Sequence, residues 1–144
     1  MPVFYTEADY ENSVIELFRN DLGYDYVYGP DVERDFYSPL YEEVLVESLY
    51  RLNRGLSNDA IQEALCKLKS FENGELVQKN SAFMEYLQNG IPVRYFVDGE
   101  ERSVIVYLAD YKNPDQNSFI IANQWTYIEN SNKRPDIILF LNGL

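Results

Sequence analysis

The spacing of apolar residues changes at Gly90, and this change limits the folds open to the chain. Before Gly90, apolar residues recur every three or four positions, as in helices that bury one face. After Gly90 they alternate or run together, as in strands. The pattern predicts an α/β (α+β) fold in which N-terminal helices pack on a mixed open sheet. The helical part covers residues 1–90 and the sheet covers residues 91–144.

Capping and turn residues divide the helical part into four predicted helices. A Ser or Thr N-cap opens three of them, and a Gly follows the last turn of three. The predicted segments are residues 6–24 (Thr6 cap with Asp9, end at Gly23), 38–55 (Ser38 cap, Pro39 first, end at Gly55), 57–70 (Ser57 cap) and 73–90 (with a break near Asn80).

The sheet part predicts a hairpin and two further strands. Residues 93–97 and 103–111 flank the turn sequence DGEER, which indicates the hairpin. Residues 118–128 form the next strand. Residues 136–141, DIILFL, are apolar on both faces and suit a central strand of a covered sheet. The sheet is expected to be incomplete at the C-terminus.

Composition excludes several kinds of chemistry. The chain has no histidine, which removes the usual Ser-His-Asp and Cys-His machinery and every histidine-containing zinc site. Carboxylates with a hard metal such as Mg²⁺ remain as a means of catalysis. The formal net charge of −12 repels nucleic acid at long range, so DNA binding would need a local site or other domains.

The bulk of the sequence fits one domain, or a piece of one, from a reducing compartment. No apolar run approaches the roughly 20 residues of a membrane span. The N-terminus has no signal-peptide pattern, so a cytoplasmic location with no membrane partner is expected. Cys66 is the single cysteine, which excludes an internal disulfide.

Glu11 is the first candidate site residue. On the wheel of the first predicted helix it lies inside the apolar arc of Tyr10, Val14, Ile15, Leu17, Phe18 and Leu22, with Glu7 one turn earlier. A carboxylate on a core face is costly unless something binds its charge. Either Glu11 reaches the rim of the sheet and pairs with an arginine, or it points into a metal or substrate site.

Asp136 is the second candidate, because it opens the apolar strand at residues 136–141. One reading is a Pro-Asp turn in which Asp136 caps nearby amides. The other places its carboxylate at the sheet edge, where the active sites of open sheets collect. Lys133 and Arg134 precede it as salt-bridge partners or phosphate contacts.

Asn123 and Gln124 interrupt the apolar strand at residues 118–128. Neighbouring residues of a strand face opposite ways, so one of the two is expected to point to the active-site side. Gln124 is the candidate for supporting the site, with a plain structural amide as the alternative.

Several blocks, in order, resemble the N-terminal part of the R (motor) subunit of type I restriction endonucleases. They are YEEVLVESLYRLNRGLSNDAIQEALCKL, NSAFMEYLQNGIPVRY, YLADYKNPDQNSFIIANQWTY and RPDIILFLNGL. The resemblance covers nearly the full length. The family usually has Pro where Arg54 stands, a departure that touches no chemistry.

The resemblance implies a PD-(D/E)xK nuclease fold in which Asp136 is the first acid of the motif. The Glu-x-Lys half would follow on the next strand, so the chain is expected to be a fragment cut between the halves and inactive alone. In the complete site these groups would hold Mg²⁺ and position a water. Glu11, followed by Gly23 and Tyr24, also resembles the first-helix glutamate of related nucleases such as Holliday-junction resolvases.

The same resemblance implies a larger machine. ATP would be used by motor domains outside this chain, and DNA would be cleaved together with methylation and specificity subunits. The competing hypothesis is a non-catalytic acidic binding module, such as a DNA mimic that uses the −12 charge. A third is a family member that has lost activity and keeps the fold for assembly.

Overall fold

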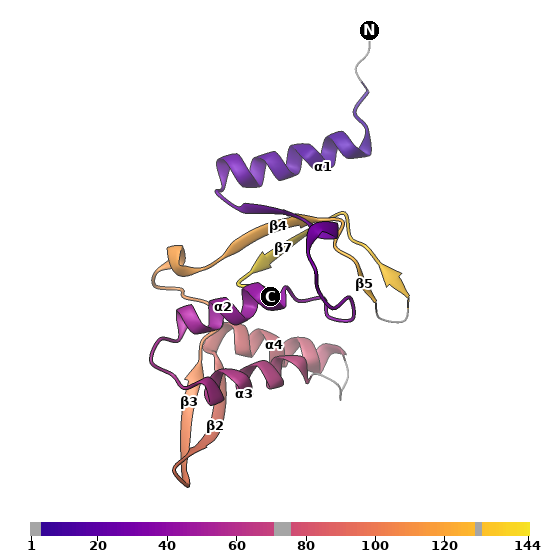
Figure 1. The fold of residues 1–144 in the computed structure, drawn as a ribbon. Coiled ribbons are helices and arrows are strands. Elements are labelled where there is room, and N and C mark those ends of the chain that lie inside the picture. The colour runs from indigo at the N-terminus through magenta and orange to yellow at the C-terminus, as the bar shows by residue number, and fades with distance from the viewer. Residues whose placement is uncertain (1–3, 71–75, 129–130) are drawn as a thin grey trace. The chain divides into compact units, whose positions relative to one another are not determined.

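The computed structural model describes residues 4–70, 76–128 and 131–144 (Figure 1). The chain divides into two compact units. The first combines the N-terminal residues up to Glu42 with Ser118–Leu144, and the second is Glu43–Asn117. The architecture is mixed α and β with a mixed sheet, as the apolar pattern predicts.

The first unit opens with helix α1 (Glu7–Glu16), which starts where the sequence predicts but ends before the predicted Gly23. Thr6 Oγ1 accepts the Asp9 N–H at 3.2 Å, and Asp9 Oδ2 accepts the Thr6 N–H at 2.8 Å, so the capping box is complete. The helix continues as a π-helical turn, η1 (Leu17–Asp21). Gly23, with φ of 73°, then reverses the chain into the sheet.

The sheet of this unit has three strands in the order β1–β4–β7. Strand β1 (Asp25–Tyr28) is parallel to β4 (Phe119–Asn123), and β7 (Ile137–Leu141) is antiparallel to β4. The expectation that residues 136–141 form a central strand is wrong for the described sheet. Strand β4 is central and almost entirely buried, whereas β7 lies at an edge and leaves Leu139 45% exposed.

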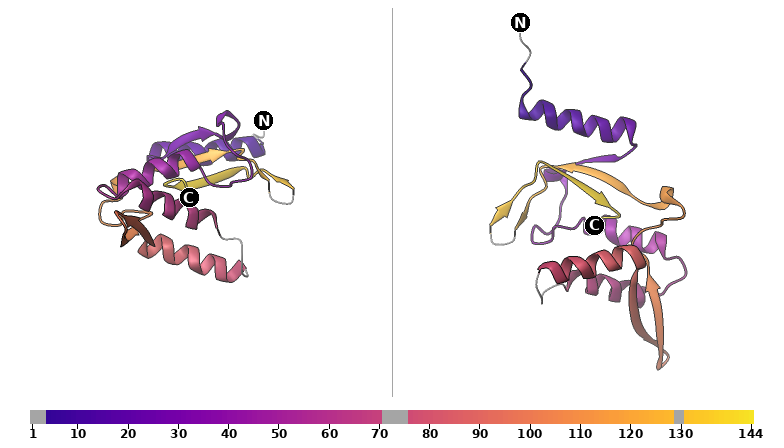
Figure 2. Two further views of the ribbon diagram at one scale, coloured as in Figure 1. Left: turned by 60° about the horizontal axis from the view of Figure 1, so that its bottom comes forward. Right: turned by 180° about the vertical axis from the view of Figure 1, so that it is seen from behind.

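Helix α1 lies along one face of this sheet (Figures 1 and 2). Of its apolar arc, only Ile15 is buried. Phe18, in η1, is half-buried, and its ring packs 4.9 Å from that of Tyr24. A narrow sheet covers a single line of positions i, i+4 and i+7, here 11, 15 and 18. The wider predicted arc is therefore wrong, and its other members are exposed: Tyr10, Val14, Leu17 and Leu22.

A left-handed residue divides the long strand predicted at residues 118–128. Gln124 has φ of 53°, and the chain resumes as β5 (Tyr127–Ile128), paired with β6 (Asn132–Lys133) in a separate two-stranded sheet. Left-handed backbone costs a non-glycine residue about 1–2 kcal/mol. The surrounding contacts must therefore stabilise this break.

The second unit holds helices α2 (Glu42–Leu52), α3 (Asn58–Lys69) and α4 (Leu76–Asn89). The Ser57 cap of α3 is confirmed, since its side chain accepts the Ala60 N–H. Ser38 does not cap α2, because residues before Glu42 make other contacts: the Pro39 carbonyl accepts Trp125 Nε1–H at 3.0 Å. Helix α4 is continuous through Asn80, contrary to the predicted break; its predicted start at residues 73–75 lies outside the described residues.

The predicted hairpin is confirmed as β2 (Ile91–Val97) and β3 (Glu100–Val106). Asp98 and Gly99 form its two-residue turn with φ of 51° and 80°, the conformation that matches the twist of the flanking strands. Helix α3 packs its apolar stripe against this hairpin. The buried stripe is Ala60, Ile61, Ala64, Leu65 and Leu68, as its spacing predicts.

Within the second unit, two asparagine side chains each bond both the N–H and the carbonyl of one residue, as the main chain of a neighbouring strand would. Asn53 Oδ1 accepts the Tyr107 N–H at 2.7 Å, while its Nδ2 donates to the Tyr107 carbonyl at 2.8 Å and the Leu49 carbonyl at 2.9 Å. Asn117 pairs with both backbone groups of Asp110 at 2.8 Å. These amides satisfy main-chain groups where strand pairing ends.

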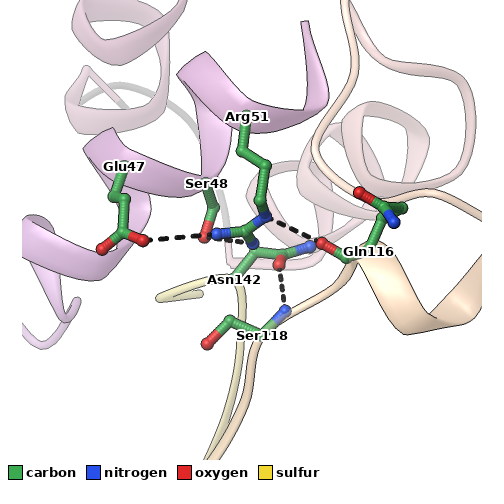
Figure 3. Close-up of polar contacts among 6 residues, drawn as sticks. All are labelled: Glu47, Ser48, Arg51, Gln116, Ser118 and Asn142. Atoms are coloured by element: carbon green, nitrogen blue, oxygen red, sulfur yellow. Dashed lines mark hydrogen bonds and ion pairs between the residues drawn. The ribbon is translucent and has the colours of Figure 1, made fainter.

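Arg51 joins helix α2 to the 3₁₀ segment η3 (Pro114–Gln116) of the second unit (Figure 3). Its Nε donates to the Gln116 carbonyl at 2.9 Å, Nη2 donates to Ser48 Oγ at 3.2 Å, and Nη1 lies 3.5 Å from Glu47 Oε1. In the first unit, the buried Asn142 makes two hydrogen bonds to the main chain of Ser118 (Figure 3). Its Oδ1 accepts the Ser118 N–H at 2.7 Å, and its main-chain N–H donates to the Ser118 carbonyl at 2.8 Å. Both clusters are structural.

Candidate active site

Glu11 projects from α1 towards the end of β4 and is half-buried. Its Oε1 accepts Asn123 Nδ2–H at 2.9 Å, and Gln124 Nε2 lies 3.4 Å from both carboxylate oxygens. The charge is therefore bound by two amides, and in the described part of the chain it pairs with no arginine. Two neutral donors orient a carboxylate without neutralising it, which leaves its negative charge available to a cation.

The two amides reach the same carboxylate because the strand breaks between them. In an extended strand, Asn123 and Gln124 would point to opposite faces. The left-handed conformation of Gln124 turns its side chain to the side already occupied by Asn123. Both amides contact Glu11, so the expectation that only one of the two would point to this side of the strand is wrong.

Tyr26 of β1 sets the orientation of the Asn123 amide. Its hydroxyl donates to Asn123 Oδ1 at 2.9 Å, so Nδ2 is directed to Glu11. Arg19 lies over the Tyr26 ring, 5.3 Å from its centre. Tyr26 was not predicted from the sequence, where it is one tyrosine in an aromatic stretch. The pairing of β1 with β4 brings it next to Asn123.

Asp136 lies directly before β7, and its carboxylate is exposed. Within the described residues that carboxylate accepts no hydrogen bond, so the turn-capping reading has no support there. The Asp136 carbonyl accepts the Gln124 N–H at 3.2 Å. Gln124 thus connects the two candidate acids, through its backbone to Asp136 and through its side chain to Glu11.

The other predicted site residues lie near the ends of these elements. Glu7 is exposed in the first turn of α1, and Arg134 is exposed two residues before Asp136. Lys133, on β6, has its Nζ 5.9 Å from the centre of the Tyr127 ring. In the described ranges, neither Glu7 nor Arg134 makes a hydrogen bond or ion pair with Glu11 or Asp136.

Arg34, which was not predicted from the sequence, contacts both residues that follow Gln124. Its guanidinium carbon lies 3.7 Å from the centre of the Trp125 ring, and Nη2 donates to the Thr126 carbonyl. Desolvation by this burial lowers the pKa of Arg34, while the nearby charge of Asp35 opposes that shift. Only the three-dimensional structure places Arg34 next to the break at Gln124.

The two candidate acids carry the oxygen ligands that suit a hard cation, but they are few. Glu11 and Asp136 offer carboxylate oxygens, which Mg²⁺ prefers. Over residues 4–70, 76–128 and 131–144, no group of three or more Asp, Glu, His or Cys side chains is arranged to hold a metal ion. The carboxylate oxygens of these two acids are of the kind that Mg²⁺ prefers, but they are fewer than the six oxygens that the ion favours.

A family model for the type I restriction enzyme R protein N terminus matches residues 4–144. The chain belongs to this family. The Haemophilus influenzae type I restriction enzyme HindI endonuclease subunit is 30% identical over 96% of the chain. A Methanocaldococcus jannaschii protein named "Putative type I restriction enzyme MjaIXP endonuclease subunit" is 28% identical over 93% of it. The chain spans 14% of the length of each of these relatives, so it corresponds to a small part of an R protein.

Membership in the R-protein family agrees with the resemblance found in the sequence blocks, including the segment that carries Asp136. Among the described residues of this R-protein N terminus, no helix is long and apolar enough to cross a membrane.

Proposed function

We propose that this chain is the N-terminal part of the DNA-cleaving nuclease domain of a type I restriction R subunit. The observation that carries the proposal is the linkage of Glu11 to Asp136 through Gln124. At the end of the central strand, the Gln124 side chain contacts the Glu11 carboxylate, and the Gln124 N–H donates to the main-chain carbonyl of Asp136, which lies 125 positions after Glu11 in the chain. Active sites of open sheets collect at such strand ends.

In the complete domain, Glu11 and Asp136 would be two of the ligands of Mg²⁺. Bound there, the metal would lower the pKa of a water molecule and stabilise the charge that develops on the phosphodiester. The Glu-x-Lys half implied by the PD-(D/E)xK resemblance would supply the other protein groups from a longer chain. Mg²⁺ favours six oxygens in near-octahedral order, so two carboxylates alone would hold it weakly.

The residues of this chain would act mainly by orientation. Asn123 and Gln124 hold the Glu11 carboxylate in one direction, and Tyr26 holds Asn123. Supporting hydrogen bonds of this kind fix a ligand before the metal arrives. The exposed carboxylate of Asp136 accepts no hydrogen bond in the described part of the chain and would serve as the second acid.

The remaining activities are proposed for the whole protein. DNA cleavage would be coupled to ATP-driven translocation by domains outside this chain, with methylation and specificity subunits as partners, in the cytoplasm. The net charge of −12 opposes DNA binding by this segment alone. Delivery of DNA by the motor and the partner subunits would overcome that repulsion.

The test is Asp136→Ala in the full-length protein assembled with its partner subunits. Plasmid cleavage should fall below detection, while ATP hydrolysis stays at the wild-type rate. Asp115→Ala, which removes an exposed aspartate of the second unit, is the matched control and should cut normally. If Asp136→Ala still cuts DNA, the proposed nuclease site is wrong and the acidic binding module becomes the better account.

A further inference from the structure

The clamp around Trp125 is the feature of the first unit that the proposed function leaves unexplained. Arg34 lies over Trp125 and donates from Nη2 to the Thr126 carbonyl, from Nη1 to the Ser38 carbonyl at 3.2 Å, and more weakly to the Asp35 carbonyl at 3.4 Å. Its buried Nε finds no acceptor in the described residues. A half-buried guanidinium with one nitrogen lacking an acceptor depends on its other contacts to stabilise it in this position.

Trp125 is a rigid anchor for this clamp. Its side chain is fully buried, and its Nε1 donates to the Pro39 carbonyl at 3.0 Å. The rings of Phe140 and Tyr41 lie 4.8 Å and 5.1 Å from it. The residue that follows the left-handed Gln124 is therefore held from several directions, with Arg34 covering a ring face.

Gly29 encloses the same break from another side. It is buried, and a Cβ added there would lie 2.6 Å from the Asn123 and Gln124 carbonyl oxygens. Backbone atoms cannot yield to such a contact cheaply. Gly29 begins the short 3₁₀ segment η2 (Gly29–Asp31) that leads to Arg34, so one loop supplies both the close approach and the clamp.

We infer that Arg34 is a positioning residue of the nuclease site: its clamp on Trp125 and Thr126 holds Gln124 in the left-handed conformation that directs two amides to Glu11. The inference rests on the proposed function for its catalytic consequence. Without the clamp, residues 124–126 relax towards an extended strand. The Gln124 side chain then turns to the opposite face, and the Glu11 carboxylate keeps Asn123 alone.

Arginine suits this role and lysine does not. A planar guanidinium can stack on an indole and donate in the same plane to several carbonyls, whereas a lysine ammonium is a single point charge. Arg34→Lys should therefore behave like Arg34→Met, although it keeps the charge. A lysine variant with full activity would show that charge alone is needed and would overturn the clamp.

The experiment uses the full-length protein with its partner subunits and compares Arg34→Met with Arg51→Met. Arg51 is a matched control because, like Arg34, it donates to a main-chain carbonyl, here that of Gln116. It also donates to the buried Ser48 hydroxyl, and it lies in the second unit. Arg34→Met should lower plasmid cleavage about 10- to 100-fold, the cost of displacing a supporting group, with ATP hydrolysis unchanged. Arg51→Met should leave the ratio of cleavage to ATP hydrolysis unchanged.

Hydrogen–deuterium exchange gives a readout that does not depend on activity. In Arg34→Met, the peptide covering residues 123–128 should exchange about 10-fold faster, while the peptide covering α3 keeps its wild-type rate. A general loss of stability would accelerate both peptides, and unchanged exchange at 123–128 would overturn the inference.

A double variant separates positioning from other roles. If Arg34 acts through Gln124, the double variant Arg34→Met, Gln124→Ala should cleave at a rate within about twofold of the single variant Gln124→Ala. Fully additive losses would overturn the inference. Asp136→Ala is run beside these variants: if it cuts normally, the proposed function fails, whereas the exchange experiment still decides whether the clamp holds residue 124.

Discussion

Asn123 Nδ2 donates to Glu11 Oε1 at 2.9 Å, a hydrogen bond between residues 112 positions apart in the chain. It joins the first helix to the end of the central strand. Because the donor is neutral, the carboxylate is oriented and its charge is kept. This relationship separates Glu11 from an ordinary surface glutamate.

Glu11→Gln should impair DNA cleavage far more than stability. The variant keeps a hydrogen-bonding side chain but loses the negative charge that a cation needs. Loss of a metal ligand should lower cleavage by more than the roughly 10- to 100-fold expected for loss of a supporting group. We therefore expect the cleavage rate of the assembled full-length protein to fall more than about 100-fold. Glu16→Gln, an exposed change on the same helix, should cut at the wild-type rate. Equal activity of the two variants would remove Glu11 from the site.

Gln124→Ala and Gln124→Gly should be equally poor in cleavage but differ in stability. Both lose the amide that contacts Glu11, which should cost about 10- to 100-fold in cleavage and little in ATP hydrolysis. Glycine adopts positive φ without strain, so the Gly variant should be about 1 kcal/mol more stable than the Ala variant. Urea denaturation measures the difference; an Ala variant as stable as the Gly variant would argue against strain at this position.

Asn53→Ala should destabilise the second unit by about 2–3 kcal/mol, since it leaves the Tyr107 N–H and carbonyl without their amide partner. Asn80→Ala, at an exposed position within α4, should change the free energy of unfolding by less than about 0.5 kcal/mol. Urea denaturation followed by circular dichroism compares the two. Similar values for both variants would contradict a structural role for Asn53.

The capping box of α1 should contribute stability that depends on pH. The backbone hydrogen bond from Thr6, followed by the one from its side chain, lowers the pKa of Asp9 below the ordinary value of 3.8. A lowered carboxyl pKa stabilises the folded state fully above the unfolded value of about 3.8 and loses that contribution as pH falls through the folded pKa. Thr6→Ala removes the side-chain hydrogen bond and keeps the backbone one, so NMR titration should show the Asp9 pKa rising only part of the way towards its ordinary value. No change in that variant would exclude the Thr6 side chain as a cause.

The isolated 144-residue chain should neither bind Mg²⁺ tightly nor nick plasmid DNA. Two carboxylates offer too few of the six oxygens that the ion favours. Calorimetric titration should show no tight binding, and plasmid should remain supercoiled at every Mg²⁺ concentration. Nicking by this chain that Asp136→Ala abolishes would mean that its own residues form a complete site.

Much of the fold could be predicted because short-range interactions decide it. The Thr6 and Ser57 caps, the Asp98–Gly99 turn and the stripe of α3 each depend on residues a few positions apart. The positions of Glu11 and Asp136 as candidate acids also followed from local pattern. A polar residue stands out against the apolar positions of its own helix or strand.

Tertiary structure alone decided how those acids are held. The break at Gln124, the turn of both amides to Glu11 and the clamp by Arg34 depend on contacts between residues about 90 to 110 positions apart. Local pattern predicted an unbroken strand there, because the β-branched and aromatic residues of the stretch 118–128 favour an extended chain. The packing around Trp125 and the close approach of Gly29 outweigh that preference. These are contacts between residues far apart in the chain, which the spacing of apolar residues does not reveal.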